Sequence, residues 1–90
     1  MMKPTIHLNG TSREALHEQY LNAWHALREA QRMLDLSHPH GRDYYVQNKE
    51  GEGPYGEPFY LAEKEHRARV HALVKVEQEL EELALHTMPL

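Results

Sequence analysis

Arginine and tyrosine side chains that could bind an anionic ligand occur together near the middle of the chain. Arg42, Tyr44 and Tyr45 follow Gly41 in a single short stretch. Arginine presents a planar fork of donors that suits phosphate, and a tyrosine ring can stack on a nucleobase. We therefore expect these three residues to bind a phosphate-bearing small molecule. Asp43 would orient an arginine, because its own charge repels phosphate.

His66 and Arg69 lie one helical turn apart later in the chain. Residues at positions i and i+3 share one helix face, so both can line the wall of the same pocket. His66 also falls on an apolar seam between Ala62 and Val70, where a histidine is usually a core residue with one hydrogen-bond partner. Two interpretations of His66 stay open: a core residue, or a donor to an anion that Arg69 also binds.

Two Glu-x-x-His patterns could hold a metal, Glu14 with His17 and Glu63 with His66. Ferritin-like di-iron bundles place this pattern on inward helix faces, and the second pattern resembles one in encapsulin-associated ferritins, which are two-helix chains that dimerise. In an antiparallel pair of helices the two patterns lie at opposite ends, so they cannot join within one chain. We therefore predict no metal or other cofactor, and a di-iron carboxylate protein is the third functional hypothesis.

The elements that position these residues follow from hydrophobic periodicity. Apolar residues recur at spacings of three and four from Leu16 to Leu34 and from Phe59 to Leu83, which is typical of helices that pack along one seam. The chain is therefore predicted to be all-α, with helices over about 12–36 and 58–86, a loop over 37–57 and a lead-in segment over 1–10. We expect one domain over residues 1–90, an antiparallel helical hairpin.

Residue types at the ends of these periodic stretches set their bounds. Thr11 with Glu14 forms a capping box before the first helix. Pro39 and Gly41 end that helix, because proline has no N–H and glycine tolerates a left-handed exit. Pro58 suits the first position of the second helix.

Composition excludes several classes of protein. The chain has 90 residues, no cysteine and a formal charge of −4, so disulfide frameworks, cysteine zinc sites and thiol nucleophiles are absent. The apolar runs are far shorter than the roughly 20 residues that span a membrane, and the first residues lack a signal-peptide core. The acidic balance disfavours duplex nucleic acid as a partner. We expect a cytoplasmic protein that is not an enzyme.

Charge is distributed unevenly along the predicted hairpin. Cations gather at the loop end, and most of the acids of the helices lie toward the other end. This pattern fits ion pairs along the helix surface, such as Glu29 with Arg28 and Arg32. It also fits an antiparallel pairing of two copies that matches basic ends to acidic ends. The third interpretation is the anion site described above.

The two helices have apolar faces too wide to cover one another in a monomer. A chain of about 90 residues buries only about two thirds of the surface that its unfolded form exposes. Pairing with further copies of the chain would cover the remaining apolar surface. The sequence therefore predicts a homo-oligomer, a dimer or larger, built as a helical bundle.

Three stretches resemble a family of small proteins encoded by tailed phages and prophages. They are Ile6 to Ser12, Pro39 to Tyr45, and Glu65 to Arg69. The family shares His-Leu-Asn-Gly-Thr, Gly-Arg-Asp-Tyr-Tyr and Glu-His followed by Arg, and the insertion over 47–57 is larger here than usual. The resemblance implies a phage-encoded protein in the cytoplasm of an infected or lysogenic bacterium.

These observations lead to three functional hypotheses. Small phage proteins that sequester the nucleotide signals of host defence are oligomers with pockets between subunits, and by analogy the first hypothesis is such a binding protein. Its ligand would contact Arg42, Asp43, Tyr44, Tyr45, His66 and Arg69. The alternative is a protein-interaction or inhibitor module without a small-molecule site. The di-iron protein is the third.

Overall fold

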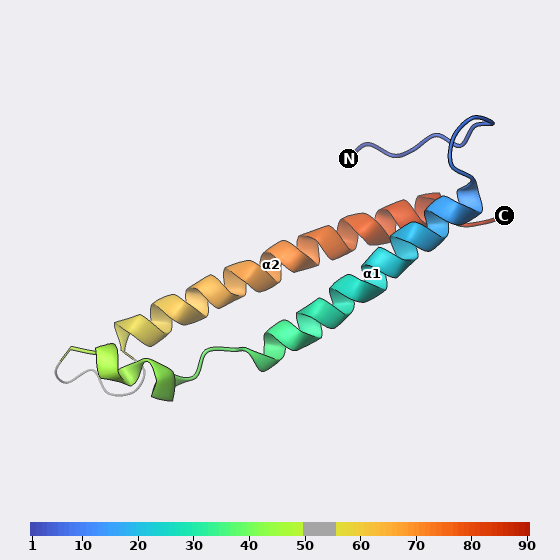
Figure 1. Cartoon of the computed structure of the whole chain (residues 1–90). Helices are drawn as coiled ribbons and strands as arrows, with labels where there is room; N and C mark the ends of the chain where they lie inside the picture. Colours follow the sequence, from blue (N-terminus) through green and yellow to red (C-terminus); the bar gives the residue numbers. More distant parts are fainter. Residues whose placement is uncertain (50–55) are drawn as a thin grey trace.

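The computed structural model shows an antiparallel helical hairpin and describes residues 1–49 and 56–90 (Figure 1). Helix α1 spans Arg13–Leu36 and helix α2 spans Glu57–His86, with two short 3₁₀ helices between them, η1 (Gly41–Asp43) and η2 (Tyr45–Gln47). The prediction of two packed helices is confirmed. Residues 50–55, most of the predicted insertion, lie outside the described residues. In the part of the chain that is described, no helix is long and apolar enough to cross a bilayer.

Ser12, and not Thr11, is the N-cap of α1. Ser12 has an extended backbone, and its side chain accepts a hydrogen bond from the Ala15 N–H at 3.1 Å. The predicted capping box was therefore one residue too early, because neighbouring hydroxyl residues offer the same chemistry and the backbone decides between them. Glu14 still lies in the first turn, where its charge favours the positive end of the helix dipole.

The other helix ends are satisfied by local hydrogen bonds. The Ser37 hydroxyl donates to the Leu34 carbonyl at 2.8 Å and ends α1 before Pro39. The predicted left-handed exit at Gly41 is wrong, because this glycine instead begins η1. Gly56 is the N-cap of α2. Thr87 caps the last turn of α2 and is fully buried, with its N–H and its hydroxyl both donating to the Leu83 carbonyl.

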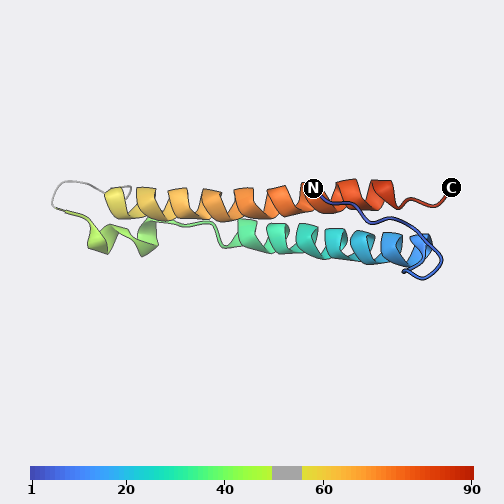
Figure 2. The ribbon, with the colours of Figure 1, turned by 90° about the horizontal axis from the view of Figure 1, so that it is seen from above.

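The hairpin is a rod with very little interior. Its extents are 67 × 21 × 18 Å, and in Figure 2 α1 and α2 lie side by side along most of its length. Among the described residues, Ala84 is the one buried apolar side chain. The polar side chains of His66 and Thr87 are also buried. The helix–helix seam is half-buried along residues such as Leu27 and Leu73. Packing within one chain therefore leaves much apolar surface exposed.

The lead-in segment lies along the terminal end of the hairpin (Figure 2). The His86 ring donates from Nε2 to the Pro4 carbonyl at 2.9 Å, and Lys3 lies 3.8 Å from Glu82. A turn brings the Gly10 N–H to the His7 carbonyl at 3.1 Å. The contacts of Lys3 and Pro4 join the lead-in segment to residues more than 75 positions later in the sequence, at the end of α2.

Candidate functional site

A cleft of about 400 Å³ opens at the loop end, between the η2 region and the first turns of α2. Residues from the loop form one wall, and α2 residues at spacings of three and four form the other. The lining residues are Tyr44, Gln47, Lys49, Glu57, Pro58, Leu61, Ala62, Glu65 and Arg69. The cleft therefore combines an apolar floor, an aromatic ring and charges of both signs.

Short-range hydrogen bonds fold the loop so that Tyr44 lies against α2. His40 caps η1 by accepting from the Arg42 N–H at 3.3 Å, and the Tyr44 N–H donates to the Gly41 carbonyl at 3.1 Å. The Gln47 N–H then donates to the Tyr44 carbonyl at 2.9 Å. Tyr44 is half-buried as a result. The periodicity of the sequence did not predict these two 3₁₀ turns, because each is a single turn long.

The charges of the cleft are balanced. Lys49 and Arg69 oppose Glu57 and Glu65, and the Arg69 guanidinium lies 3.5 Å from the Glu65 carboxylate one turn earlier. Both side chains of that pair are more than half exposed, where an ion pair adds little stability. An anionic ligand can therefore replace Glu65 as the partner of Arg69 with little loss of free energy. Lys49 would add a second cation to the same ligand.

The structure brings two of the predicted ligand residues together. Tyr44 and Arg69 face the same cleft from opposite walls. Arg42 and Asp43 lie in η1 and are exposed, and Tyr45 is also exposed, but none of these three lines the cleft. Pairing of Arg42 with Arg69 around one phosphate thus stays a prediction.

His66 is packed inside the hairpin. Its side chain is 4 % exposed, and its ring meets the edge of the His38 ring with centroids 4.8 Å apart. His66 is not among the residues that line the cleft. The geometry matches the interpretation of His66 as an interior residue. A role as donor to a bound anion would require the cleft to deepen toward the seam.

The Glu-x-x-His patterns do not assemble a metal site within the described residues. No group of three or more His, Asp or Glu side chains there is placed to hold a metal ion. His17 donates from Nδ1 to the Ala84 carbonyl at 2.8 Å at the terminal end, whereas Glu63 and His66 lie at the loop end. Within the described residues of one chain, Glu63 and His66 are therefore not joined by the further ligands that a di-iron centre uses.

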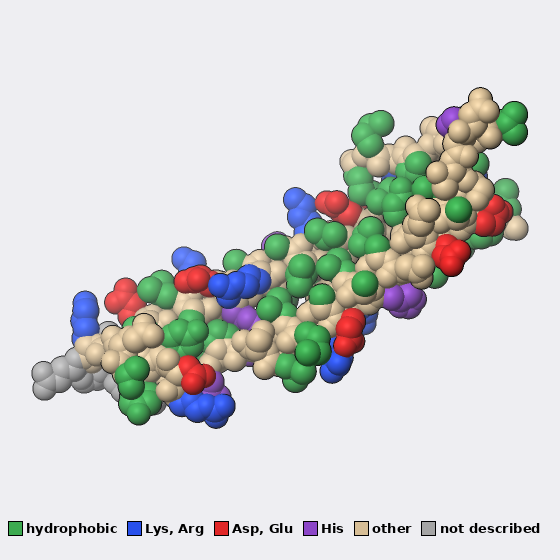
Figure 3. All heavy atoms as spheres, in the orientation of Figure 1, with side chains coloured by type: hydrophobic (Ala, Val, Ile, Leu, Met, Phe, Trp, Pro, Cys, Tyr) green, Lys and Arg blue, Asp and Glu red, His purple; other side chains and the backbone are tan. Residues whose placement is uncertain are grey.

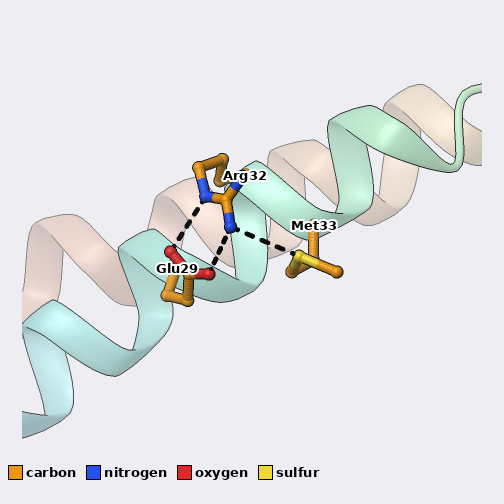
Figure 4. Close-up of polar contacts among 3 residues, drawn as sticks. All are labelled: Glu29, Arg32 and Met33. Atoms are coloured by element: carbon orange, nitrogen blue, oxygen red, sulfur yellow. Dashed lines mark hydrogen bonds and ion pairs between the residues drawn. The ribbon is translucent and has the colours of Figure 1, made fainter.

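Other cations of the loop half take part in ion pairs. Arg32 donates to both oxygens of Glu29, at 3.0 and 2.7 Å, beside Met33 (Figure 4). This hydrogen bond, with the charge of Arg32, lowers the pKa of Glu29 below its ordinary value. Arg28 does not join Glu29 as predicted but reaches Glu77 on α2 at 3.0 Å.

Glu77 ties the two helices together. Its side chain is 14 % exposed and accepts from the Gln31 amide at 2.9 Å as well as from Arg28. The Gln31 hydrogen bond, followed by the hydrogen bond and charge of Arg28, lowers the pKa of Glu77 although burial opposes this. The sequence did not reveal this contact, because it depends on the register between α1 and α2.

A second, more apolar hollow lies at the terminal end and was not predicted. About 270 Å³ in volume, it is lined by His17, Leu21, Trp24, Glu81, Ala84, Leu85 and Met88. The Trp24 indole N–H is buried without a hydrogen-bond partner, and the Arg28 guanidinium lies 5.1 Å from the centre of its ring. The spacing of Leu21 and Trp24 on one helix face was the sequence signal for this hollow.

Comparison of the chain with protein families, with curated proteins and with solved structures gave no match.

Proposed function

We propose that the protein is a non-catalytic binding module that works as a self-associated helical bundle. The observation that carries this proposal is the near absence of an interior: Ala84 is the one fully buried apolar residue in the described part of the chain. Large side chains on both helices stay exposed, including Met33 at 52 % and Leu61 at 48 %. Full burial of such a side chain from water stabilises a protein by about 1.5–3 kcal/mol, and burial of the exposed half on association contributes roughly half of that for each side chain.

Sedimentation equilibrium at micromolar concentration tests this proposal. The expected mass is at least twice the 10.6 kDa of one chain. Circular dichroism at the same concentrations reports whether helicity follows association. A stable, fully helical monomer would contradict the proposal.

A second candidate function is the sequestration of a phosphate-bearing small molecule, such as a nucleotide signal of host defence. The observation that favours it is the loop-end cleft, where Tyr44, Lys49 and Arg69 line one volume above an apolar floor. A phosphate would replace Glu65 as the partner of Arg69, and the base would lie on the Tyr44 ring. Other small phage proteins sequester such signals, and by analogy with them this role would be carried out in an infected cell.

Calorimetry with adenine dinucleotides, cyclic dinucleotides and ADP-ribose derivatives tests the second candidate. A charge-assisted hydrogen bond contributes about 1.5–3 kcal/mol, so Arg69→Ala is expected to weaken binding at least about tenfold. Arg42→Ala is the matched arginine variant outside the cleft. An equal loss with Arg42→Ala would mean that η1 folds over the ligand, and no heat with any ligand would count against this function.

A further inference from the structure

An exposed apolar stripe runs along α1 beside the helix–helix seam. Its members are Ala23, Ala26, Ala30 and Met33, which follow spacings of three and four and are all exposed. They adjoin the half-buried Leu27 and Leu34 of the seam. An α-helix turns about 100° per residue, so this stripe lies roughly 100° around α1 from the side that contacts α2.

A matching stripe runs along α2. Leu61, Ala68, Ala72 and Val76 are exposed and recur at spacings of seven, four and four, with the charged Glu65 at the stripe position between Leu61 and Ala68. This stripe is also rotated by roughly 100° from the side of α2 that contacts α1, and in the same sense. Two antiparallel helices are related by a two-fold axis normal to their common plane, so equal rotations bring both stripes to the same side of the hairpin.

The two stripes together form one surface, which we call the apolar face: Ala23, Ala26, Ala30, Met33, Leu61, Ala68, Ala72 and Val76. Figure 3 shows hydrophobic side chains gathered along the seam between the helices. The opposite side of α1 is polar and carries a hollow lined by His25, Arg28, Glu29, Gln31, Arg32 and Asp35. Over residues 25–35, α1 therefore has an apolar side suited to burial and a polar side suited to water.

The exposed area of the chain is large enough for a stable interface. One chain exposes 6913 Å², whereas a compact monomer of its mass exposes about 5,500 Å². The excess of about 1,400 Å² exceeds the roughly 800 Å² that each partner buries in a standard interface. The rod therefore exposes enough surface for an extended partner, and a second hairpin has the matching length.

The distribution of charge selects the orientation of that second copy. Residues 25–71 carry seven of the ten Lys and Arg residues and eight acids, a net charge of −1, whereas the terminal half of the hairpin carries six acids and three cations, a net charge of −3. The acids of the terminal half are Glu14, Glu18, Glu77, Glu79, Glu81 and Glu82. A parallel pair would place these acids against each other, and an antiparallel pair places them against the loop end.

We infer that the apolar face binds the apolar face of a second copy, in antiparallel orientation about a two-fold axis near Ala72, to form a four-helix bundle. This inference rests on the proposed self-association and adds its surface and its orientation. The polar side of each hairpin faces solvent. The loop-end cleft of one chain then lies beside the terminal end of its partner.

Charge substitutions on the two sides of the rod test the surface. Val76 is 45 % exposed on the apolar face, and Leu85 is 60 % exposed outside it. Val76→Glu is expected to raise the dissociation constant on the order of 100-fold, measured by sedimentation, whereas Leu85→Glu keeps the wild-type constant. Dissociation by Leu85→Glu alone would overturn the inferred surface while leaving self-association intact. A monomeric wild-type protein would contradict both the inferred surface and the proposed self-association.

Spin labels test the orientation without adding charge, and the chain has no native cysteine. Labels at Ala72→Cys are expected to lie close together in the dimer. Leu61 is eleven residues from Ala72, about 16 Å along the helix, so labels at Leu61→Cys are expected about 30 Å apart. Equally short distances at both positions would show a parallel pair and overturn the inference.

Discussion

Thr87 closes the end of the hairpin, and replacing it with valine should lower stability by a defined amount. Its hydroxyl donates to the Leu83 carbonyl at 2.9 Å from a fully buried side chain. Valine keeps the shape but removes the donor. The Leu83 carbonyl still accepts from the N–H of residue 87, and the Ala84 carbonyl still accepts from His17. No buried acceptor is left unpaired, so the cost is that of one hydrogen bond, about 1 kcal/mol.

Thermal unfolding at a fixed protein concentration measures this loss, because association makes the Tm depend on concentration. A loss of 1 kcal/mol corresponds to a fall in Tm of roughly 4–8 °C for a domain of this size. Thr87→Ser keeps the hydroxyl but removes a buried methyl group, which costs about 0.8 kcal/mol, so Thr87→Ala, which loses both groups, should fall by about the sum of the two losses. A Thr87→Val protein that melts with the wild type, at the same concentration, would refute the role of the hydroxyl.

Three further outcomes follow from the seam and the polar contacts. The lowered pKa of Glu77 means that its contribution to stability is present above about pH 4.3 and is lost as the pH falls through the lowered pKa. Glu77→Gln should therefore flatten the acid dependence of urea unfolding, whereas Glu18→Gln on the exposed surface keeps it. Leu27→Glu places a charge in the helix seam and should unfold or dissociate the protein, as seen by circular dichroism and sedimentation. Dialysis against a chelator should leave the Tm unchanged, and a drop of many degrees restored by iron or zinc would support the di-iron hypothesis instead.

The helices were predictable because their hydrophobic repeat spans many turns. The predicted bounds of 12–36 and 58–86 differ from Arg13–Leu36 and Glu57–His86 by one residue at each start. The error at Thr11 has a physical cause: Thr11 and Ser12 both carry a hydroxyl, and only backbone geometry shows which one reaches an N–H. A hydrophobic repeat over many turns therefore predicts a helix correctly even when its capping residue is assigned one position too early.

The candidate site was less predictable because it depends on single turns and on register. The loop showed no repeat, and its two 3₁₀ turns bring Tyr44 but not Arg42 to the cleft. The partner of Arg28 depends on the axial register between α1 and α2. Residue spacing within one helix does not reveal that register. The buried Thr87 went unnoticed for a similar reason, since its burial depends on packing at the end of the hairpin.

The contacts that join distant parts of the chain are concentrated at the terminal end. There Arg13 reaches the His86 carbonyl, His17 reaches the Ala84 carbonyl and the lead-in segment is held at Pro4. A two-helix rod has contacts only between adjacent turns, so one end can open while the other stays closed. The terminal end of the hairpin is therefore expected to be more stable against local opening than the loop end. We therefore expect amide hydrogens near the loop to exchange through small local openings, and those beside Thr87 to exchange more slowly.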